Sequence, residues 1–184
     1  MTDLQWETLD DEVAYACEGF DIVRERVRLP NGEETEFDHL SDAESVVVLP
    51  FTADGDVVVI DEWRQAVKRR NRGLPAGNVE GEEDLDAAVR RELREETGYR
   101  AGAVEHLTTM EPANGFSDAV FHYYVARDCE ATAEQDLDYN ESIDVETVAF
   151  DSLVAAAREG DLRDGRTAFG VVYYALFEAE FGTR

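Results

Sequence analysis

Residues 77–99 read GNVEGEEDLDAAVRRELREETGY and carry the pattern that decides the fold of this chain. The pattern is Gly-x5-Glu-x7-Arg-Glu-apolar-x-Glu-Glu-x-Gly-apolar, and Leu93 and Tyr99 fill its two apolar positions. From about residue 84 to residue 97 the apolar residues recur at helical spacing, and Gly98 follows as a helix stop. The stretch therefore predicts one helix with a single buried stripe.

The glutamates of this helix suggest a metal site. Glu92 and Glu96 lie one turn apart on a second face, and two carboxylates in that relation repel each other. Arg91 precedes Glu95 by four residues and can hold it, which leaves Glu92 and Glu96 free to share a cation. Oxygen ligands of this kind suit Mg²⁺, with Mn²⁺ as an alternative. Glu83, near the start of the helix, can approach the same site from below.

A solvated acidic face is the competing interpretation of the same glutamates, because charge runs are commonly just surface. The residues around them favour the metal site. Gly77, Gly98 and the preceding segment Leu74-Pro75-Ala76 have no role in a merely soluble helix. They predict a loop that brings the main chain up to the metal.

The complete pattern resembles the Nudix box, and the chain is similar to the ADP-ribose pyrophosphatase branch of the Nudix hydrolases. The resemblance implies an α/β/α sandwich with a mixed sheet over residues 43–184. It also implies a small antiparallel β extension over residues 1–42, which in that branch joins a homodimer. The metal ligands implied are the main-chain carbonyl of Ala76 and the carboxylates of Glu83, Glu92, Glu95 and Glu96.

Alternating and valine-rich runs predict the remaining elements. The expected strands lie near residues 13–16, 20–28, 34–38, 45–50, 56–61, 103–110, 119–127 and 143–150. The strands 45–50 and 56–61 are expected to be buried and to form a hairpin around Ala53-Asp54-Gly55. Residues 63–73 are expected to form a loop, followed by a short strand into Pro75. Two C-terminal helices are expected near 151–159 and 165–180.

Residues outside the box bear on the substrate. The segment from Pro112 through Gly115 and Phe116 is similar to the loop that marks ADP-ribose pyrophosphatases, and an ordinary turn is the alternative. Trp63 could stack on a base and Arg64 could bind a phosphate, although a surface aromatic and an ion pair would explain them equally. The chain departs from the family pattern twice: Gly73 and Ala119 stand where relatives often carry glutamate.

A catalytic base is expected among three glutamates. Related pyrophosphatases place a general-base glutamate on a loop before a strand, and Glu141 occupies that position. Glu95 and Glu96 are the competing bases. A base must come within hydrogen-bond reach of the attacking water, and a mobile loop can deliver it.

The composition is strongly acidic, with 43 acidic and 17 basic residues and a net charge of −26, and Lys68 is the only lysine. This pattern is typical of a protein adapted to molar salt, and it argues against a nucleic-acid partner. A basic protein partner remains an alternative. Cys17 and Cys129 fit free thiols in the cytoplasm, and no membrane span is expected.

These observations predict metal-assisted hydrolysis of a nucleoside diphosphate linked to another group, with ADP-ribose yielding AMP and ribose 5-phosphate as the leading substrate. Another nucleotide sugar or a dinucleotide is the alternative substrate. A Nudix-like module that senses a nucleotide without cutting it is the alternative function. The complete box and the absence of a basic appendage favour the enzyme.

Overall fold

The computed structural model describes residues 4–178 and divides into two compact units. One unit comprises Met1–Glu44 with Glu111–Val120, and the other comprises Ser45–Met110 with Phe121–Arg184. The first three and last six residues of the chain, including the end of the helix expected to reach residue 180, lie outside the described part.

The N-terminal unit is a three-stranded antiparallel sheet of order β1-β2-β3. Its strands are β1 (Glu7–Ala16), β2 (Asp21–Arg28) and β3 (Glu34–Ser41). The turn expected at residues 30–32 joins β2 to β3, and Gly32 has the positive φ of 88° that such a turn requires. Trp6 meets Phe37 edge to face, with ring centroids 5.9 Å apart. The small antiparallel extension predicted from the sequence is therefore present.

The second unit contains the mixed sheet. Its order is β7-β4-β10-β9, with β4 parallel to β10 and the other pairs antiparallel. A second sheet has the order β12-β5-β6, and β8 pairs with β11. The strand bounds are β4 (Ser45–Pro50), β5 (Asp56–Arg64), β6 (Arg69–Gly73), β7 (Ala76–Asn78), β8 (Tyr99–Arg100), β9 (Ala103–Met110), β10 (Phe121–Arg127), β11 (Glu130–Ala131) and β12 (Ile143–Ala149).

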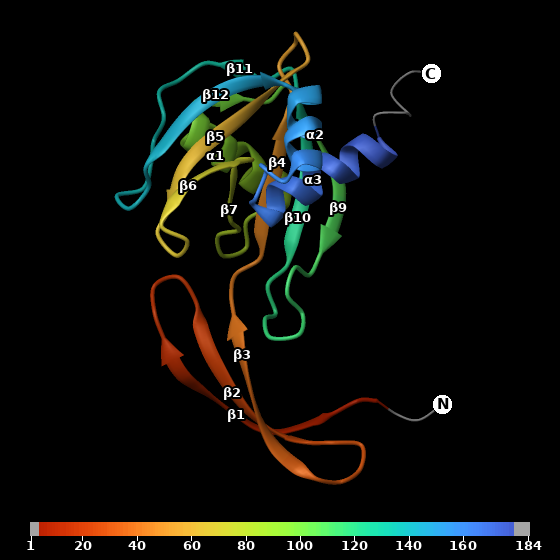
Figure 1. Cartoon of the computed structure of the whole chain (residues 1–184). Coiled ribbons are helices and arrows are strands. Elements are labelled where there is room, and N and C mark those ends of the chain that lie inside the picture. Colours follow the sequence, from red (N-terminus) through yellow and green to blue (C-terminus); the bar gives the residue numbers. More distant parts are fainter. Residues whose placement is uncertain (1–3, 179–184) are drawn as a thin grey trace. The chain divides into compact units, whose positions relative to one another are not determined.

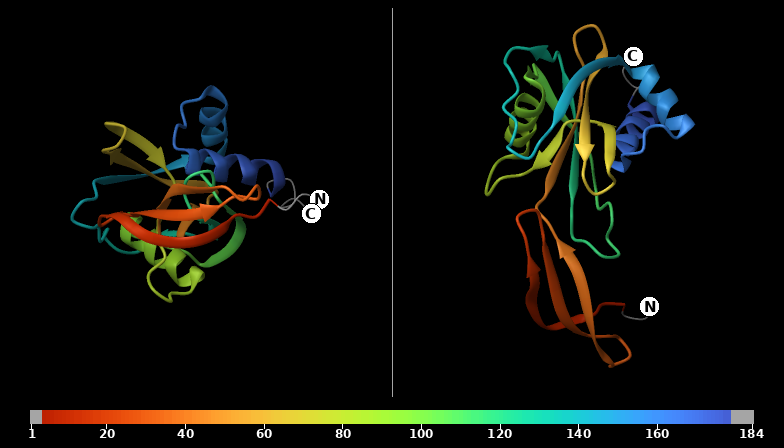
Figure 2. Two further views of the ribbon diagram at one scale, coloured as in Figure 1. Left: turned by 90° about the horizontal axis from the view of Figure 1, so that it is seen from below. Right: turned by 60° about the vertical axis from the view of Figure 1, so that its left-hand side comes forward.

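The helices of this unit are α1 (Leu85–Thr97), α2 (Phe150–Glu159) and α3 (Gly165–Phe177). Figures 1 and 2 show strands between α1 on one side and the pair α2 and α3 on the other. The α/β/α sandwich expected from the sequence is confirmed.

Strand β4 explains why the core has two halves. Side chains alternate between the faces of a strand, so a strand covered on both faces is apolar throughout. Val46 and Val48 pack in one cluster with Val89 and Leu93 of α1. The alternate residues Val47 and Leu49 pack in the other cluster, together with Leu153 of α2 and Val171 of α3. The box helix is thus fixed to one face of the central strand.

Two expectations about this region were wrong. The strands expected to form a hairpin around Gly55 are buried, but β4 and β5 belong to different sheets. A turn closed by the N–H of Thr52 and the carbonyl of Asp56 at 2.8 Å joins them, with an isolated bridge between Phe51 and Val57. Residues 63–73 are not a loop, because β5 continues to Arg64 and pairs with β6 across a tight turn. Both differences have the same cause: the valine-rich runs show that a strand is buried, but they do not show where it ends or which strand it pairs with.

Candidate active site

Helix α1 brings the box glutamates against β7. The helix begins after Asp84 and ends at Gly98, whose φ of 74° is the left-handed conformation typical of a helix C-cap. The other side of the contact is Gly77. A Cβ atom at this position would lie 2.2 Å from the carboxylate of Glu92, so only glycine admits this approach. Main chain at Gly77 therefore lies directly against the Glu92 carboxylate, and the expected approach of this loop to a metal stays a prediction.

Glu96 is the most deeply buried carboxylate of the box, with 4% of its surface exposed. Its Oε2 accepts a hydrogen bond from the main-chain N–H of Ala76 at 2.9 Å. Burial raises the pKa of Glu96 to about 8, and the negative charges of Glu92, Glu141 and Glu62 add to the rise, while the Ala76 hydrogen bond opposes it. Such a group needs a proton or a cation to be stable.

Arg91 organises the other glutamates. Its guanidinium donates to Glu83 at 2.9 Å, to Glu92 at 2.6 Å and to Glu95 at 3.3 Å. It also donates to the carbonyl of Asn78 at 2.8 Å. The expected pairing of Arg91 with Glu95 is confirmed. The expectation that Glu92 has no arginine partner was wrong, because the adjacent Arg91 donates a hydrogen bond to its carboxylate.

Arg91, Glu92, Glu95 and Glu96 line one cavity of about 420 Å³. Six of the residues predicted to be catalytic, to bind substrate or to bind metal meet there: Arg64, Ala76, Glu92, Glu95, Glu96 and Glu141. Glu83 does not line the cavity and acts instead on Arg91, which lowers the pKa of its carboxyl by hydrogen bonding. The site is formed by β5, β7, α1 and the loop before β12. It therefore contains both glutamate carboxylates and the guanidinium of Arg64.

The loop that carries Glu141 is hydrogen-bonded to the last turn of α1. The main-chain N–H of Asp136 donates to the carbonyl of Glu95 at 2.9 Å, and Nε2 of Gln135 donates to the carbonyl of Glu96 at 2.6 Å. The Glu141 carboxylate accepts from the N–H of Asp138 at 3.1 Å. The loop thus brings the Glu141 carboxylate to the cavity. Its distance in sequence from the box glutamates does not by itself predict this position.

Arg64 and Trp63 point to different places. Arg64 lines the glutamate cavity and pairs with Glu62 at 2.6 Å. Trp63 lies in a separate depression with Asp61 and Ser142, since consecutive residues of a strand face opposite sides. Its Nε1 donates to Oε1 of Gln65 at 3.0 Å. The structure brings Arg64, and not Trp63, to the box glutamates.

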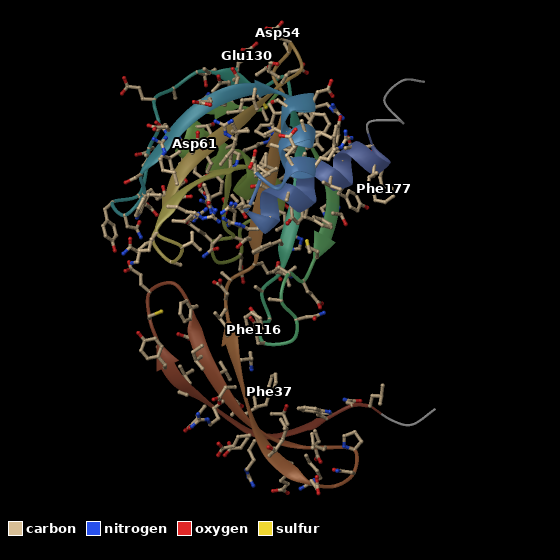
Figure 3. The ribbon with its side chains drawn as sticks, in the orientation of Figure 1. Phe37, Asp54, Asp61, Phe116, Glu130 and Phe177 are labelled. Carbon is tan, nitrogen blue, oxygen red and sulfur yellow. The ribbon has the colours of Figure 1, made fainter. Side chains whose placement is uncertain are left out.

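The loop with Pro112, Gly115 and Phe116 belongs to the N-terminal unit. The carbonyl of Phe116 accepts from the N–H of Leu40 at 2.8 Å, and the N–H of Asp118 donates to the carbonyl of Leu40 at 3.1 Å. The Phe116 side chain is largely exposed (Figure 3). The loop is therefore held along β3 by main-chain hydrogen bonds.

Sequence reasoning missed Arg166 and Glu62. Arg166 lies at the start of α3 and lines the glutamate cavity, where its guanidinium is 3.4 Å from Oδ2 of Asp164. Burial raises the pKa of Glu62, which is next to Arg64. No spacing rule connects Arg166 with a helix more than sixty residues earlier. Its only local signal is the helix N-cap formed by Asp164.

The cavity has the chemistry that a hard divalent cation requires. Within residues 4–178 no three acidic, histidine or cysteine side chains are grouped in the arrangement of a preformed metal site. Nevertheless, Glu92, Glu95 and Glu96 all border one cavity, and burial, with a smaller contribution from neighbouring carboxylates, raises the pKa of Glu96. Oxygen donors of this kind, with the carbonyl of Ala76, fit Mg²⁺ or Mn²⁺.

Comparison with known proteins gives the family. The NUDIX domain model matches residues 42–168, which include the box, α1 and the loop of Glu141. The chain belongs to the Nudix family. The comparison thereby confirms the resemblance read from the box, and this Nudix chain is a pyrophosphohydrolase.

Proteins similar in sequence to this Nudix protein include three from bacteria. The ADP-ribose pyrophosphatase of Bacillus subtilis is 28% identical over 97% of each chain. The methanol dehydrogenase activator of Bacillus methanolicus is 28% identical over 94% of each chain. The ADP-ribose pyrophosphatase of Mycobacterium tuberculosis is 30% identical over 68% of this chain and 61% of its own.

A solved structure shows the same fold as this Nudix protein. The crystal structure of an ADP compounds hydrolase superposes with a TM-score of 0.86 at 18% identity, and the match covers 99% of each chain. The match extends over the N-terminal strands as well as the sandwich.

Proposed function

We propose that this Nudix enzyme uses a divalent metal, Mg²⁺ in the first place, to hydrolyse the pyrophosphate bond of ADP-ribose. The observation that carries the proposal is the glutamate cavity, where Glu92 and the buried Glu96 lie with Arg64 and Arg166. Carboxylates can hold a hard cation, and guanidinium groups can bind the diphosphate oxygens in bidentate fashion. The names of two relatives support ADP-ribose as the substrate.

The reaction is the attack of water on one phosphorus of the diphosphate. The new P–O bond forms to the water oxygen, the bond to the bridging oxygen breaks, and the water gives up a proton. The products are AMP and ribose 5-phosphate. A divalent metal supplies charge neutralisation at the phosphate and lowers the pKa of the attacking water.

The chain's own residues then have separate roles. Glu92, Glu95, Glu96 and the carbonyl of Ala76 would hold the metal, while Glu83 acts through Arg91. Glu141 is our first candidate for the base that accepts the proton of water, because its loop is fastened next to α1 and its carboxylate borders the cavity. Glu95 and Glu96 are the competing candidates.

The test is a substrate panel with Mg²⁺ in molar KCl, followed by variants. The panel contains ADP-ribose, other ADP-sugars, NADH and nucleoside triphosphates, and its breadth also covers the alternative substrates. Glu96→Gln should abolish turnover while circular dichroism stays unchanged, and Glu141→Gln should lower kcat by about a hundred-fold or more. Glu105→Gln, at an exposed position of β9, is the matched control and should keep full activity.

Two results would contradict the proposal. If the parent chain binds a nucleotide but turns over no member of the panel, it is a sensor. If another nucleotide sugar is cleaved with a much higher kcat/KM than ADP-ribose, the substrate assignment fails and the hydrolase assignment stands.

We also propose that the N-terminal unit joins two copies of the chain. Its exposed side chains include large apolar ones, and water contact with such groups is unfavourable. These are Trp6, Val13, Tyr15 and Phe20. Sedimentation equilibrium should give a dimer for the whole chain, and a monomer for the whole chain would reject this proposal.

We propose a reducing, cytoplasmic location, which the two free cysteines support. Labelling of Cys17 in extracts prepared without reductant would test it, because a chain isolated with Cys17 oxidised would contradict this location. No helix in residues 4–178 is both long and apolar enough to cross a bilayer.

A further inference from the structure

A second cavity lies beside α1, and arginine side chains form most of its lining. It measures about 320 Å³ and is lined by Arg90, Arg91, Arg94, Arg100 and Ala101. We call it the arginine depression. The chain carries 43 acidic residues against 17 basic ones, so four arginines around one hollow run against its composition.

The arginines are brought together by the fold. Arg90 and Arg94 are four residues apart, so they share a face of α1, where like charges repel by a few tenths of a kcal/mol. Arg100 lies on β8, which follows the helix directly. Nη1 of Arg90 donates to the carbonyl of Ala101 at 2.8 Å, which holds one guanidinium at the edge of the depression.

The protein neutralises these arginines unequally. Arg91 donates to Glu83, Glu92 and Glu95, and Arg94 makes a single ion pair with Glu95 at 3.0 Å. Arg90 bonds a neutral carbonyl, which leaves its charge without a carboxylate partner among the described residues. The side chain of Arg100 makes no hydrogen bond or ion pair with any residue in 4–178, although Glu130 lies opposite it across the β8–β11 pair.

We propose that the arginine depression binds a small anion that carries two linked phosphate groups, with inorganic pyrophosphate as the simplest member of the class. The guanidinium groups of Arg90, Arg94 and Arg100 offer paired N–H donors, which match phosphate oxygens. The site is separate from substrate cleavage, because it contains none of the cavity glutamates. The two cavities share only Arg91 in their linings.

The depression and the catalytic glutamates are therefore linked. Arg94 lines the depression and holds Glu95, so a phosphate bound in the depression competes with Glu95 for the same guanidinium. The site thus has a physical route to the box, and its occupancy changes the charge balance around Glu95.

Isothermal titration of pyrophosphate into the metal-free protein tests the proposal. Divalent metal is left out so that the glutamate cavity cannot retain pyrophosphate through an ion, and KCl is fixed at a concentration that keeps the chain folded. We expect one site, and we expect Arg90→Gln/Arg100→Gln to weaken it at least about ten-fold, since each replacement removes a charged donor. Replacing Arg90 and Arg100 leaves the hydrogen bonds of Arg91 and Arg94 to the glutamates in place.

Two controls locate the effect. Arg158→Gln removes an equal charge from the exposed last turn of α2 and should leave the affinity unchanged. Arg90→Lys/Arg100→Lys keeps the charge and should bind more weakly than the parent and more tightly than the glutamine variant. Phosphate should bind more weakly than pyrophosphate because it bridges fewer arginines.

Three outcomes would overturn the proposal. They are the absence of pyrophosphate binding by the parent chain, equal affinity in the parent and the glutamine variant, or an equal loss in Arg158→Gln. Circular dichroism of each variant shows whether a loss comes from unfolding. If the glutamine variant fails to fold, the Arg90→Lys/Arg100→Lys variant provides the test. If that lysine variant binds both pyrophosphate and phosphate as tightly as the parent chain does, recognition by the guanidinium groups is rejected.

Discussion

At the scale of single residues, Gly77 determines where Glu92 can lie. The close contact between them predicts that Gly77→Ala pushes the Glu92 carboxylate aside, because the new methyl group would overlap it at 2.2 Å. A flexible side chain can move at small cost, so we expect the free energy of unfolding to change by less than about 1 kcal/mol. Activity should fall by about ten-fold or more, since a small misplacement of a catalytic group costs rate.

Steady-state kinetics and urea unfolding measure the two effects of Gly77→Ala separately. Gly19→Ala is the control, because a Cβ at Gly19 meets no atom within 4 Å. Equal kcat in both variants and the parent would show that Glu92 tolerates the displacement and has no exacting role.

The raised pKa of Glu96 leads to a prediction about how the stability of the metal-free protein depends on pH. Its pKa is about 8 in the folded chain against an ordinary value of 4.5, so between these pH values the folded state binds a proton that the unfolded state has lost. The contribution of Glu96 to stability is therefore fully present at low pH and is lost as the pH rises to about 8. The slope is at most about 1.4 kcal/mol per pH unit for one group.

Urea unfolding of the metal-free chain at several pH values between about 5 and 8.5 tests this prediction. Glu96→Gln removes the titrating group, so its stability should fall less over the same range than that of the parent. Parallel pH profiles would mean that the Glu96 carboxyl is ionised at neutral pH in the folded chain.

At the scale of elements, the sequence predicted α1 well because the information is local. Apolar spacing, the arginine and the glycine stop all lie within one stretch, and the helix begins and ends within a residue of the prediction. The strands β4 and β5 show the opposite case. Their burial is readable from the valines, but their partners are not, because β4 pairs with β10, 76 residues later, and β5 pairs with β12.

The candidate site divides in the same way. The box supplied Glu92, Glu95 and Glu96, whereas Arg166 enters only because α3 packs beside the central strand. A sequence pattern describes residues that share an element. Residues that meet through the packing of separate elements leave no fixed spacing to read.

The end of α1 gives the prediction at this scale. Gly98 has a positive φ, and a Cβ there would lie 2.3 Å from the main-chain carbonyl oxygen of Ala133, which cannot move as freely as a side chain. Gly98→Ala should therefore destabilise the fold by more than the roughly 1 kcal/mol that an alanine at positive φ costs. It should also lower kcat, because the loop of Glu141 starts from this contact.

Gly160→Ala provides the matched comparison for the helix end. Gly160 has a φ of 81° as the C-cap of α2, and a Cβ there meets nothing within 4 Å. The difference between the two variants in urea unfolding isolates the backbone clash from the strain of positive φ. Equal destabilisation would show that the 132–142 loop adjusts without cost.

At the scale of the whole molecule, the sequence divided the chain at residue 42, whereas the contacts group Met1–Glu44 with Glu111–Val120. The long-range contacts are specific: Ser41 donates its hydroxyl hydrogen to Asp118 at 2.7 Å, and Leu40 bridges to Ser117. No periodicity in either segment could reveal a pairing across 77 residues. The assignment of residues 1–42 and 43–184 as domains stays a prediction.

The charge of the whole chain leads to the last prediction, which concerns salt. A net charge of −26 makes the folded protein repel itself, and folding brings those charges closer together. Raising the salt from about 0.1 M to about 1 M shortens the screening length from about 10 Å to about 3 Å, which removes most of the long-range repulsion. The midpoint of thermal unfolding should therefore rise steadily from low to molar KCl. Sucrose at matched osmolality separates screening from general solute effects, and a midpoint that stays level or falls in KCl would reject adaptation to high salt.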